Sequence, residues 1–177
     1  MSTSKFGSKL ILAAVALTFA MPLHAQNLGQ VVGEGDLANW DISIGRDGVG
    51  LPTGSGTSSE GSAIWSEQCS ACHGENGKGG PAGDLVGGIG SLTSLEHNKT
   101  VGSFWPYSTT LFDYVRRAMP YYAPGSLSDD EVYSIVAYLL NQNEIITDDA
   151  IMDAESLPQV EMPNADGFIS YWPVANQ

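Results

Sequence analysis

The sequence contains Cys69-Ser70-Ala71-Cys72-His73, the motif in it that carries the most specific chemistry. Two thiols three residues apart at the end of a helix can each add across one vinyl group of a single haem, while the adjacent histidine reaches the iron. The chain has two cysteines, so this motif uses both. The pattern predicts one covalent haem c, attached through Cys69 and Cys72, with His73 as an iron ligand.

Two other uses of the cysteine pair are open. A structural zinc site usually takes four ligands, but no cysteine remains and His97 is the only other histidine outside residues 1–25. A thioredoxin-like dithiol normally follows a strand in a βαβ pattern, whereas this pair follows a predicted capped helix. Both alternatives are therefore weaker than haem.

A six-coordinate haem needs a second axial ligand, and soft thioether sulfur is suitable. The candidates outside the N-terminal segment are Met119, Met152 and Met162. Met119 follows one predicted helix and precedes another, in a loop containing proline and glycine, so it is the predicted ligand. Met152 and Met162 are more typical of core gap-fillers. His97 is a rival ligand, although its neighbours predict an exposed polar turn.

Three helices surround these residues. The first begins with a capping box at Thr57-Ser58-Ser59-Glu60 and runs into the cysteine motif. The second spans Thr110–Ala118 and ends at Met119, because Pro120 disfavours helical backbone in the residue before it. The third opens with a capping box at Ser128-Asp129-Asp130-Glu131. Its apolar positions repeat with helical spacing: Val132, Ile135, Val136, Leu139 and Leu140.

Residues 1–25 are interpreted as a Sec signal peptide. Lys5 and Lys9 precede the apolar run Leu10–Ala20, and Ala25 suits cleavage. That run is shorter than the ~20 residues that span a bilayer, and no later segment is comparable. We expect a periplasmic chain without a membrane span after cleavage, an uncleaved anchor being the less favoured alternative. Outside the cytoplasm a cysteine pair is a disulfide, a metal site or a cofactor attachment.

Charge and composition divide the rest of the chain. With 7 Lys+Arg against 20 Asp+Glu the net charge is −13, which excludes nucleic acid as a partner. Residues 26–56, rich in glycine and aspartate with strand-like alternation only at 40–44, are predicted to be an extended arm, and 57–143 the haem domain. Residues 144–177 lack Lys and Arg and are either a solvated coil or a strap on the domain. Their apolar residues favour the strap.

The central part resembles class I cytochromes c. The resemblance rests on Gly61 and Trp65 before the cysteine motif, on Met119-Pro120, and on Val136-Ala137-Tyr138-Leu139. It implies an all-α fold of three to five helices around one covalent haem, here with long irregular extensions at both ends. In that fold the first and last helices cross at Gly61, and Trp65 packs near Tyr138. The resemblance also implies that the Pro81 carbonyl accepts a proton from the iron-bound histidine.

A narrower resemblance covers most of the chain after residue 25. It is carried by Trp40-Asp41-Ile42, Asp47–Pro52, Lys99–Tyr107, Thr110–Pro120 and Met162-Pro163-Asn164. These segments are similar to the cytochrome subunit of Sox-type sulfite and sulfane dehydrogenases. In that family a molybdenum-cofactor subunit oxidises the sulfur compound and the cytochrome takes the electrons one at a time. The sulfane dehydrogenase cytochrome has two haem domains, whereas this chain, with one cysteine motif, is similar to a single-haem relative.

The expected function is single-electron transfer, because ligation by His73 and Met119 leaves no coordination position for a substrate. We therefore do not expect the chain to be catalytic by itself, and its expected partners are the molybdopterin dehydrogenase and a downstream cytochrome or oxidase. Four further residues are candidates for the haem environment: Trp105, Tyr107, Arg116 and Arg117. Each also has an ordinary structural interpretation. The alternatives are a general diffusible carrier, a peroxidase-like enzyme or sensor with a displaceable sixth ligand, and a thiol protein without haem.

Overall fold

The computed structural model describes residues 29, 31–37 and 40–169. The predicted signal peptide, residues 1–25, and the aromatic residues Tyr171 and Trp172 lie outside the described residues. Among those described, the short helix α2 (Glu34–Leu37) belongs to one unit, and the residues from Ile42 onwards belong to a second, compact unit. No helix in the described part of the chain is long and apolar enough to cross a membrane.

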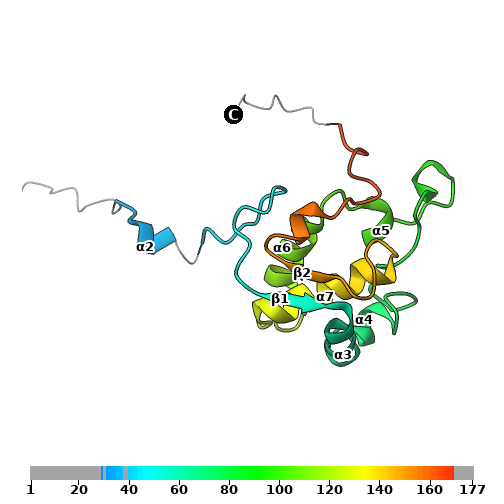
Figure 1. Ribbon diagram of the computed structural model, residues 1–177, viewed down its shortest axis with the longest axis horizontal. Helices are drawn as coiled ribbons and strands as arrows, with labels where there is room; N and C mark the ends of the chain where they lie inside the picture. Colours follow the sequence, from blue (N-terminus) through cyan, green and yellow to red (C-terminus); the bar gives the residue numbers. More distant parts are fainter. Residues whose placement is uncertain (1–28, 30, 38–39, 170–177) are drawn as a thin grey trace, which may run out of the picture. The chain divides into compact units, whose positions relative to one another are not determined.

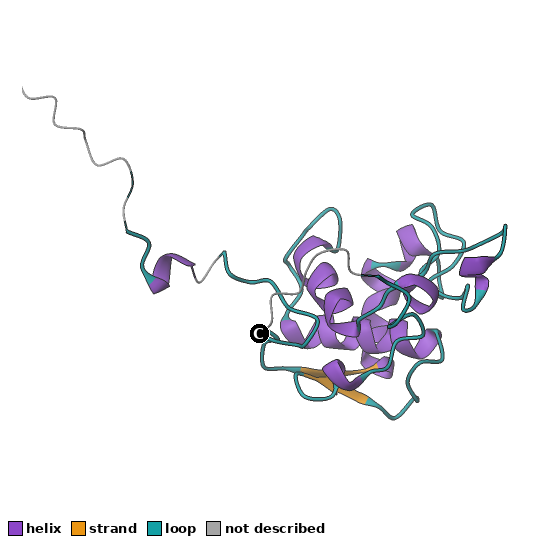
Figure 2. Cartoon of the chain, turned by 90° about the horizontal axis from the view of Figure 1, so that it is seen from above, coloured by secondary structure: helices purple, strands orange, loops and turns teal. Residues whose placement is uncertain are grey.

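The compact unit is mostly helical, which confirms the predicted fold class (Figures 1 and 2). Its helices are α3 (Ser58–Gln68), α4 (Ser70–His73), α5 (Val101–Phe104), α6 (Ser108–Ala118) and α7 (Asp129–Gln142). Two 3-10 helices, η1 (Ser91–Thr93) and η2 (Leu157–Gln159), and two short strands, β1 (Ser55–Thr57) and β2 (Ile151–Asp153), complete it.

The helices begin and end close to the predicted positions. Thr57 caps α3 and Ser128 caps α7, each in a complete capping box with the glutamate three residues later. Helix α6 ends at Ala118 as predicted, but begins at Ser108, two residues before the predicted start. The Ser108 hydroxyl donates to the carbonyl of Leu157, at 2.7 Å. This long-range hydrogen bond stabilises the additional first residues of α6, and no pattern in the neighbouring sequence predicts it.

Helices α3 and α7 cross at Gly61, as the resemblance implied. A Cβ atom at Gly61 would lie 2.6 Å from the carbonyl carbon of Ser134 and 2.8 Å from the Cβ of Tyr138. One turn further along α3, Trp65 is buried and its ring centroid lies 5.3 Å from that of Tyr138. The predicted apolar stripe of α7 is buried throughout. Glycine is thus needed at position 61 so that the two backbones can approach.

The described part of the acidic tail, residues 144–169, packs on the helices. Strand β2 pairs antiparallel with β1, Gly56 lying opposite Met152. Met152, Leu157 and Met162 are buried in the core. These apolar contacts hold a segment rich in carboxylates against the domain, so its charged side chains can face solvent.

Residues 40–44 alternate in polarity but form no strand. Ile44 is buried, and its backbone N–H donates to Oδ1 of Asp113 on α6, at 3.0 Å. The side chain of Asp113 therefore takes the hydrogen bond that a neighbouring strand would otherwise accept. The Thr109 hydroxyl, also on α6, donates to the Arg46 carbonyl at 3.1 Å. The part of the predicted arm from Ile42 onwards thus belongs to the compact unit.

Asn143, the C-cap of α7, joins this helix to the loop around residues 85–87 through its buried side chain. Its Nδ2 donates to the carbonyls of Leu139 and Leu85, at 2.8 and 3.2 Å, and its Oδ1 accepts from Gly87 N–H at 2.9 Å. The loop around residues 85–87 is thereby held at the end of the last helix.

Asn143→Ala is expected to lower the free energy of unfolding by ~2–3 kcal/mol, because it leaves buried backbone groups without partners. Chemical denaturation of the holoprotein followed by circular dichroism measures the loss. Asn76→Ala, at an exposed position, is the matched control and should change stability by less than ~0.5 kcal/mol. Equal effects of the two substitutions would contradict the role given to Asn143.

Candidate functional site

The cysteine motif lies where α3 passes into α4. Cys69 ends α3 and precedes α4, and the N–H groups of Cys72 and His73 donate to its carbonyl at 3.1 and 3.0 Å. One helical turn therefore carries both thiols and the imidazole. Both thiols are free, Cys69 half-buried and Cys72 exposed.

The two thiols differ in their surroundings. Burial, together with the nearby Cys72 thiol, raises the pKa of Cys69 to about 11. The Cys69 thiol is therefore protonated at neutral pH in the chain without haem.

One ring nitrogen of the His73 imidazole lacks a hydrogen-bond partner among the described residues. Its Nδ1 is buried and has no hydrogen-bond partner within the described residues. Buried polar atoms in proteins are nearly always satisfied, so this one requires an explanation. The Pro81 carbonyl, the acceptor implied by the resemblance, does not make this hydrogen bond here. A half-buried imidazole beside two free thiols fits the donor set of haem c, in which histidine binds iron and the thiols bind the porphyrin.

The loop after the motif is packed tightly against it. The Ala82 N–H donates to the carbonyl of Cys72 at 2.8 Å. Gly80 lies against the same backbone: a Cβ there would clash with the Cys72 oxygen and lie 2.6 Å from the carbonyl carbon of His73. Pro81 is thereby held beside the motif. Sequence reasoning assigned no role to Gly80, although its position beside Pro81 in a glycine-rich stretch is the signal that marks it.

Asp84 stabilises the other end of this loop. Its carboxylate accepts hydrogen bonds from Gly79 N–H at 2.8 Å and from Asn98 Nδ2 at 3.2 Å. These two bonds, the backbone one being the stronger influence, lower the pKa of Asp84. The carboxylate is thus ionised and fixes the turn that presents residues 80–82 to the motif.

Trp65 and Tyr138 hold the turn that follows His73. Trp65 Nε1 donates to the carbonyl of Gly74 at 3.0 Å, and its ring lies 5.9 Å from the His73 ring, centroid to centroid. The Tyr138 hydroxyl donates to the carbonyl of Glu75 at 3.4 Å, and burial raises its pKa. The helix crossing therefore positions the motif, a link that helical periodicity alone did not reveal.

The methionines occupy different environments. Met119 is half-buried at the end of α6, where its N–H donates to the Val115 carbonyl at 3.0 Å. Met152 and Met162 are buried among core side chains, as predicted for gap-fillers. His97 is exposed, in agreement with the predicted polar turn.

The two aromatic candidates lie at helix ends. Trp105 follows α5 and meets Tyr114 edge-on, with centroids 5.8 Å apart. Tyr107 precedes α6, and the Arg46 guanidinium lies 6.0 Å from the centre of its ring. Both side chains are partly buried. The structure gives them packing partners, and their role beside a haem stays a prediction.

The two arginine candidates are both engaged by carboxylates. Arg116 Nε lies 2.8 Å from Oδ1 of Asp129, at the start of α7. Arg117 Nε donates to Oδ1 of Asp113 at 3.0 Å, and this is the carboxylate that also holds Ile44. Arg116 therefore links α6 to α7, whereas Arg117 pairs within α6 with the carboxylate that holds the segment before β1. Binding of a propionate by either one stays a prediction.

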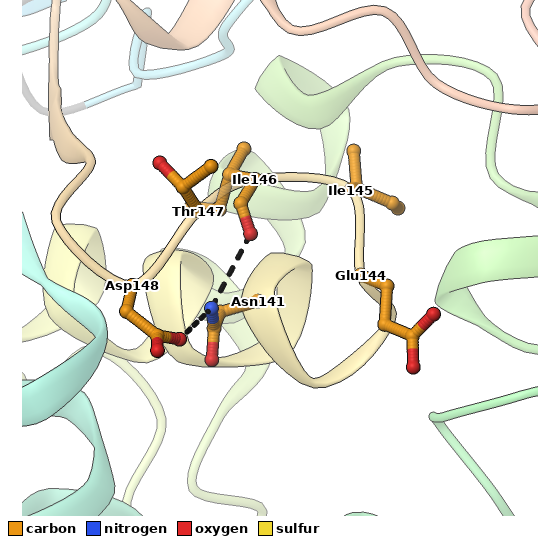
Figure 3. A pocket seen from close by; sticks show the side chains of 6 residues that line it. All are labelled: Asn141, Glu144, Ile145, Ile146, Thr147 and Asp148. Atoms are coloured by element: carbon orange, nitrogen blue, oxygen red, sulfur yellow. Dashed lines mark hydrogen bonds between the residues drawn. The ribbon is translucent and has the colours of Figure 1, made fainter.

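A surface pocket follows the end of α7, away from the cysteine motif (Figure 3). Asn141 Nδ2 points into the turn and donates to the Ile146 carbonyl at 3.3 Å and to Oδ1 of Asp148 at 2.8 Å. The remaining lining residues are Glu144, Ile145 and Thr147. These bonds explain how the tail turns back after α7, and the pocket contains no residue of the predicted site.

Comparison with known proteins gives two matches. The model of the Cytochrome c family matches residues 58–143. The chain is also similar to a chain in the crystal structure of the sulfane dehydrogenase SoxCD from Paracoccus pantotrophus, with 38% sequence identity and a TM-score of 0.75. That match covers 85% of this chain and 73% of the other. A search of curated proteins found no match.

Proposed function

The chain belongs to the cytochrome c family of haem electron-transfer proteins, and we propose that it is the electron-accepting subunit or partner of a periplasmic molybdenum sulfite or sulfur-compound dehydrogenase. The observation that carries the proposal is the similarity to a sulfane dehydrogenase chain over 85% of this chain. That similarity extends well beyond the 58–143 segment matched by the general family.

The residues that would attach the haem and bind its iron come from two segments, the cysteine motif and the end of α6. Cys69 and Cys72 would attach it, and His73 would bind iron from the same helical turn. Met119 would be the second axial ligand. Its half-buried place at a helix end supports this, since Met152 and Met162 are committed to the core. Pro81, Trp105, Tyr107, Arg116 and Arg117 are proposed to surround the haem.

This ligand set suits electron transfer better than substrate chemistry. Haem c supplies reversible one-electron exchange at iron, and a histidine and methionine pair gives it a raised reduction potential. His73 and Met119 would together leave no free position at iron, so substrate binding there would require one of them to leave. The rest of the site keeps the His73 segment rigid, through Trp65, Asp84 and the Gly80 contact, which limits structural change between oxidation states.

Export and charge complete the proposal. Residues 1–25 are proposed to be removed as a signal peptide, which takes two lysines and no acidic residue and leaves 5 basic against 20 acidic residues. We propose residues 26–56 as an arm, 57–143 as the haem domain and 144–177 as an acidic strap. The excess negative charge favours partners with basic surfaces, and the association rate should fall as salt screens the attraction.

The proposal is tested by mixing the oxidised holoprotein with the molybdenum-cofactor sulfite or sulfane dehydrogenase of the same organism and its sulfur substrate. We expect reduction of the haem, seen as growth of the ferrous α-band, at a rate that falls as ionic strength rises. A haem that dithionite reduces but the dehydrogenase with substrate does not would refute the proposed partner. The native ferrous protein should bind carbon monoxide poorly; ready binding would favour a sensor or peroxidase instead.

A further inference from the structure

We propose that an apolar arm segment, carried by Val31, Val32, Leu37 and Trp40, docks the chain onto the molybdenum-cofactor subunit of the dehydrogenase. The inference rests on the proposed function, because that function supplies the partner. It goes further by naming which residues make the contact, and by assigning the contact to a segment outside the compact haem unit.

The four side chains are exposed to an unusual degree. Val31 and Trp40 are 98% and 83% exposed, and Val32 and Leu37 are also exposed. Single exposed apolar residues are common on proteins. Four of them along one short segment, one being tryptophan, are typical of an interaction surface, where tryptophan is among the residues that contribute most to binding.

The segment is too weakly structured to bury these side chains by itself. Helix α2 has four residues and its start is held by Asp36, whose carboxylate accepts from Gly33 N–H at 3.0 Å. A helix this short is not stable in water without tertiary contacts, and the neighbouring glycines weaken it further. The apolar side chains are therefore expected to become buried when the segment orders on a partner.

Charge selects the chemistry of the partner surface. No lysine or arginine occurs between Lys9 and Arg46, whereas Glu34, Asp36 and Asp41 lie among the apolar positions. Such a segment is repelled by an anionic lipid surface. It fits an apolar groove of a protein bordered by lysine or arginine side chains.

The segment is joined to the compact unit by a short stretch of chain. Three residues lie between Trp40 and Ile44, so their Cα atoms are at most ~14 Å apart. Ile44 is fixed to α6 by its hydrogen bond to Asp113, and α6 ends next to Met119. A partner bound at Trp40 is therefore joined to the compact unit by a short tether, and short tethers give effective concentrations in the millimolar range.

The comparison with sulfane dehydrogenase supports the molybdenum-cofactor subunit as the partner of this segment. The match covers 85% of this chain, and the compact unit from Ile42 to Gln177 makes up a smaller share of it. It therefore extends to residues before Ile42. A segment that is not needed for the haem fold, but is retained in the match with a dehydrogenase chain, is expected to serve the dehydrogenase.

Photo-cross-linking identifies the occupant directly. The full chain is produced in its own cells with p-benzoylphenylalanine in place of Trp40, or in place of the exposed Leu95 as a control. After irradiation, we expect mass spectrometry to find the Trp40 position linked to peptides of a molybdenum-cofactor oxidase, and the Leu95 position not. Links only to a second copy of the chain or to lipid, or no links at all, would overturn the proposal.

Affinity measurements then test the energetic role. With the purified holoprotein and the purified oxidase, Leu37→Ala combined with Trp40→Ala is expected to raise the dissociation constant 30- to 100-fold. Ile89→Ala combined with Leu95→Ala, which also truncates exposed apolar side chains of the chain, should change it less than threefold. An arm variant that binds as tightly as the unmodified chain would overturn the docking role.

The same proteins separate failure of this inference from failure of the proposed function. At saturating oxidase, the arm variant should still be reduced by substrate as fast as the unmodified chain, because its haem site is intact. If the unmodified haem is reduced by the oxidase but the arm variant shows no loss of affinity, the docking proposal fails and the proposed function stands. If the unmodified haem is not reduced at all, the proposed function fails.

Discussion

Gly61→Val is expected to abolish the cooperative fold of the holoprotein at room temperature. The new side chain would overlap the backbone of α7, because even a Cβ at this position lies 2.6 Å from the carbonyl carbon of Ser134. A backbone atom in the middle of a helix cannot rotate away, so the two helices must separate. The substitution is expected to lower the free energy of unfolding by more than ~3 kcal/mol, the upper end of the usual cost of overpacking a core. This is a large part of the total folding free energy of a typical domain.

Separation of the helices would also release the haem motif. Trp65 would lose contact with Tyr138, and with it the position from which it holds the Gly74 carbonyl. Chemical denaturation and circular dichroism measure the stability. Ala63→Val introduces the same side chain at an exposed position of α3 and should cost only ~0.5 kcal/mol through helix propensity. A Gly61→Val protein as stable as the Ala63→Val control would refute the close helix crossing.

Met119→Ala is expected to remove the methionine-to-iron charge-transfer band of the oxidised protein. It should also lower the reduction potential by on the order of 0.1 V or more, because a soft thioether favours ferrous iron and axial ligands set haem potentials over a wide range. The truncated site should bind carbon monoxide readily, since a position at iron becomes open. Visible spectra and a redox titration measure the three changes.

Met152→Leu and Met162→Leu are the matched controls for the ligand assignment. Both residues are buried in the core, and a volume-conserving exchange there should cost less than ~1.5 kcal/mol and leave the band intact. A band that survives Met119→Ala but disappears in one of these variants would move the ligand to that methionine. A native protein without the band, whose spectrum changes in His97→Ala, would establish bis-histidine ligation.

The haem site illustrates how far local patterns reach. Cysteine spacing predicted the cofactor, and the family match agrees with it. The capping boxes at Thr57 and Ser128 predicted two helix starts correctly, because a capping box satisfies backbone groups within four consecutive residues. The prediction for α6 began two residues late, because the hydroxyl that holds its first turn contacts Leu157 rather than a neighbour in sequence.

The arginines show why the rest was not predictable. Their position near the end of α6 suggested either a propionate or solvent, but Arg116 pairs with Asp129 on α7 and Arg117 with Asp113, four residues before it on α6. Asp113 also holds Ile44, 69 residues away along the chain. A sequence displays which residues carry charge, but the choice among twenty carboxylates depends on which of them folding brings within reach.

The motif at residues 69–73, the family, and the capped helices were determined by the sequence itself, since each depends on residues close together in the chain. Only the tertiary structure decided three other features: the crossing that lets Trp65 hold the turn after His73, the β1–β2 pairing that holds the acidic tail, and the anchoring of Ile44 on α6. These depend on long-range hydrogen bonds and apolar contacts, whose partners are chosen by shape and burial after the local elements have formed.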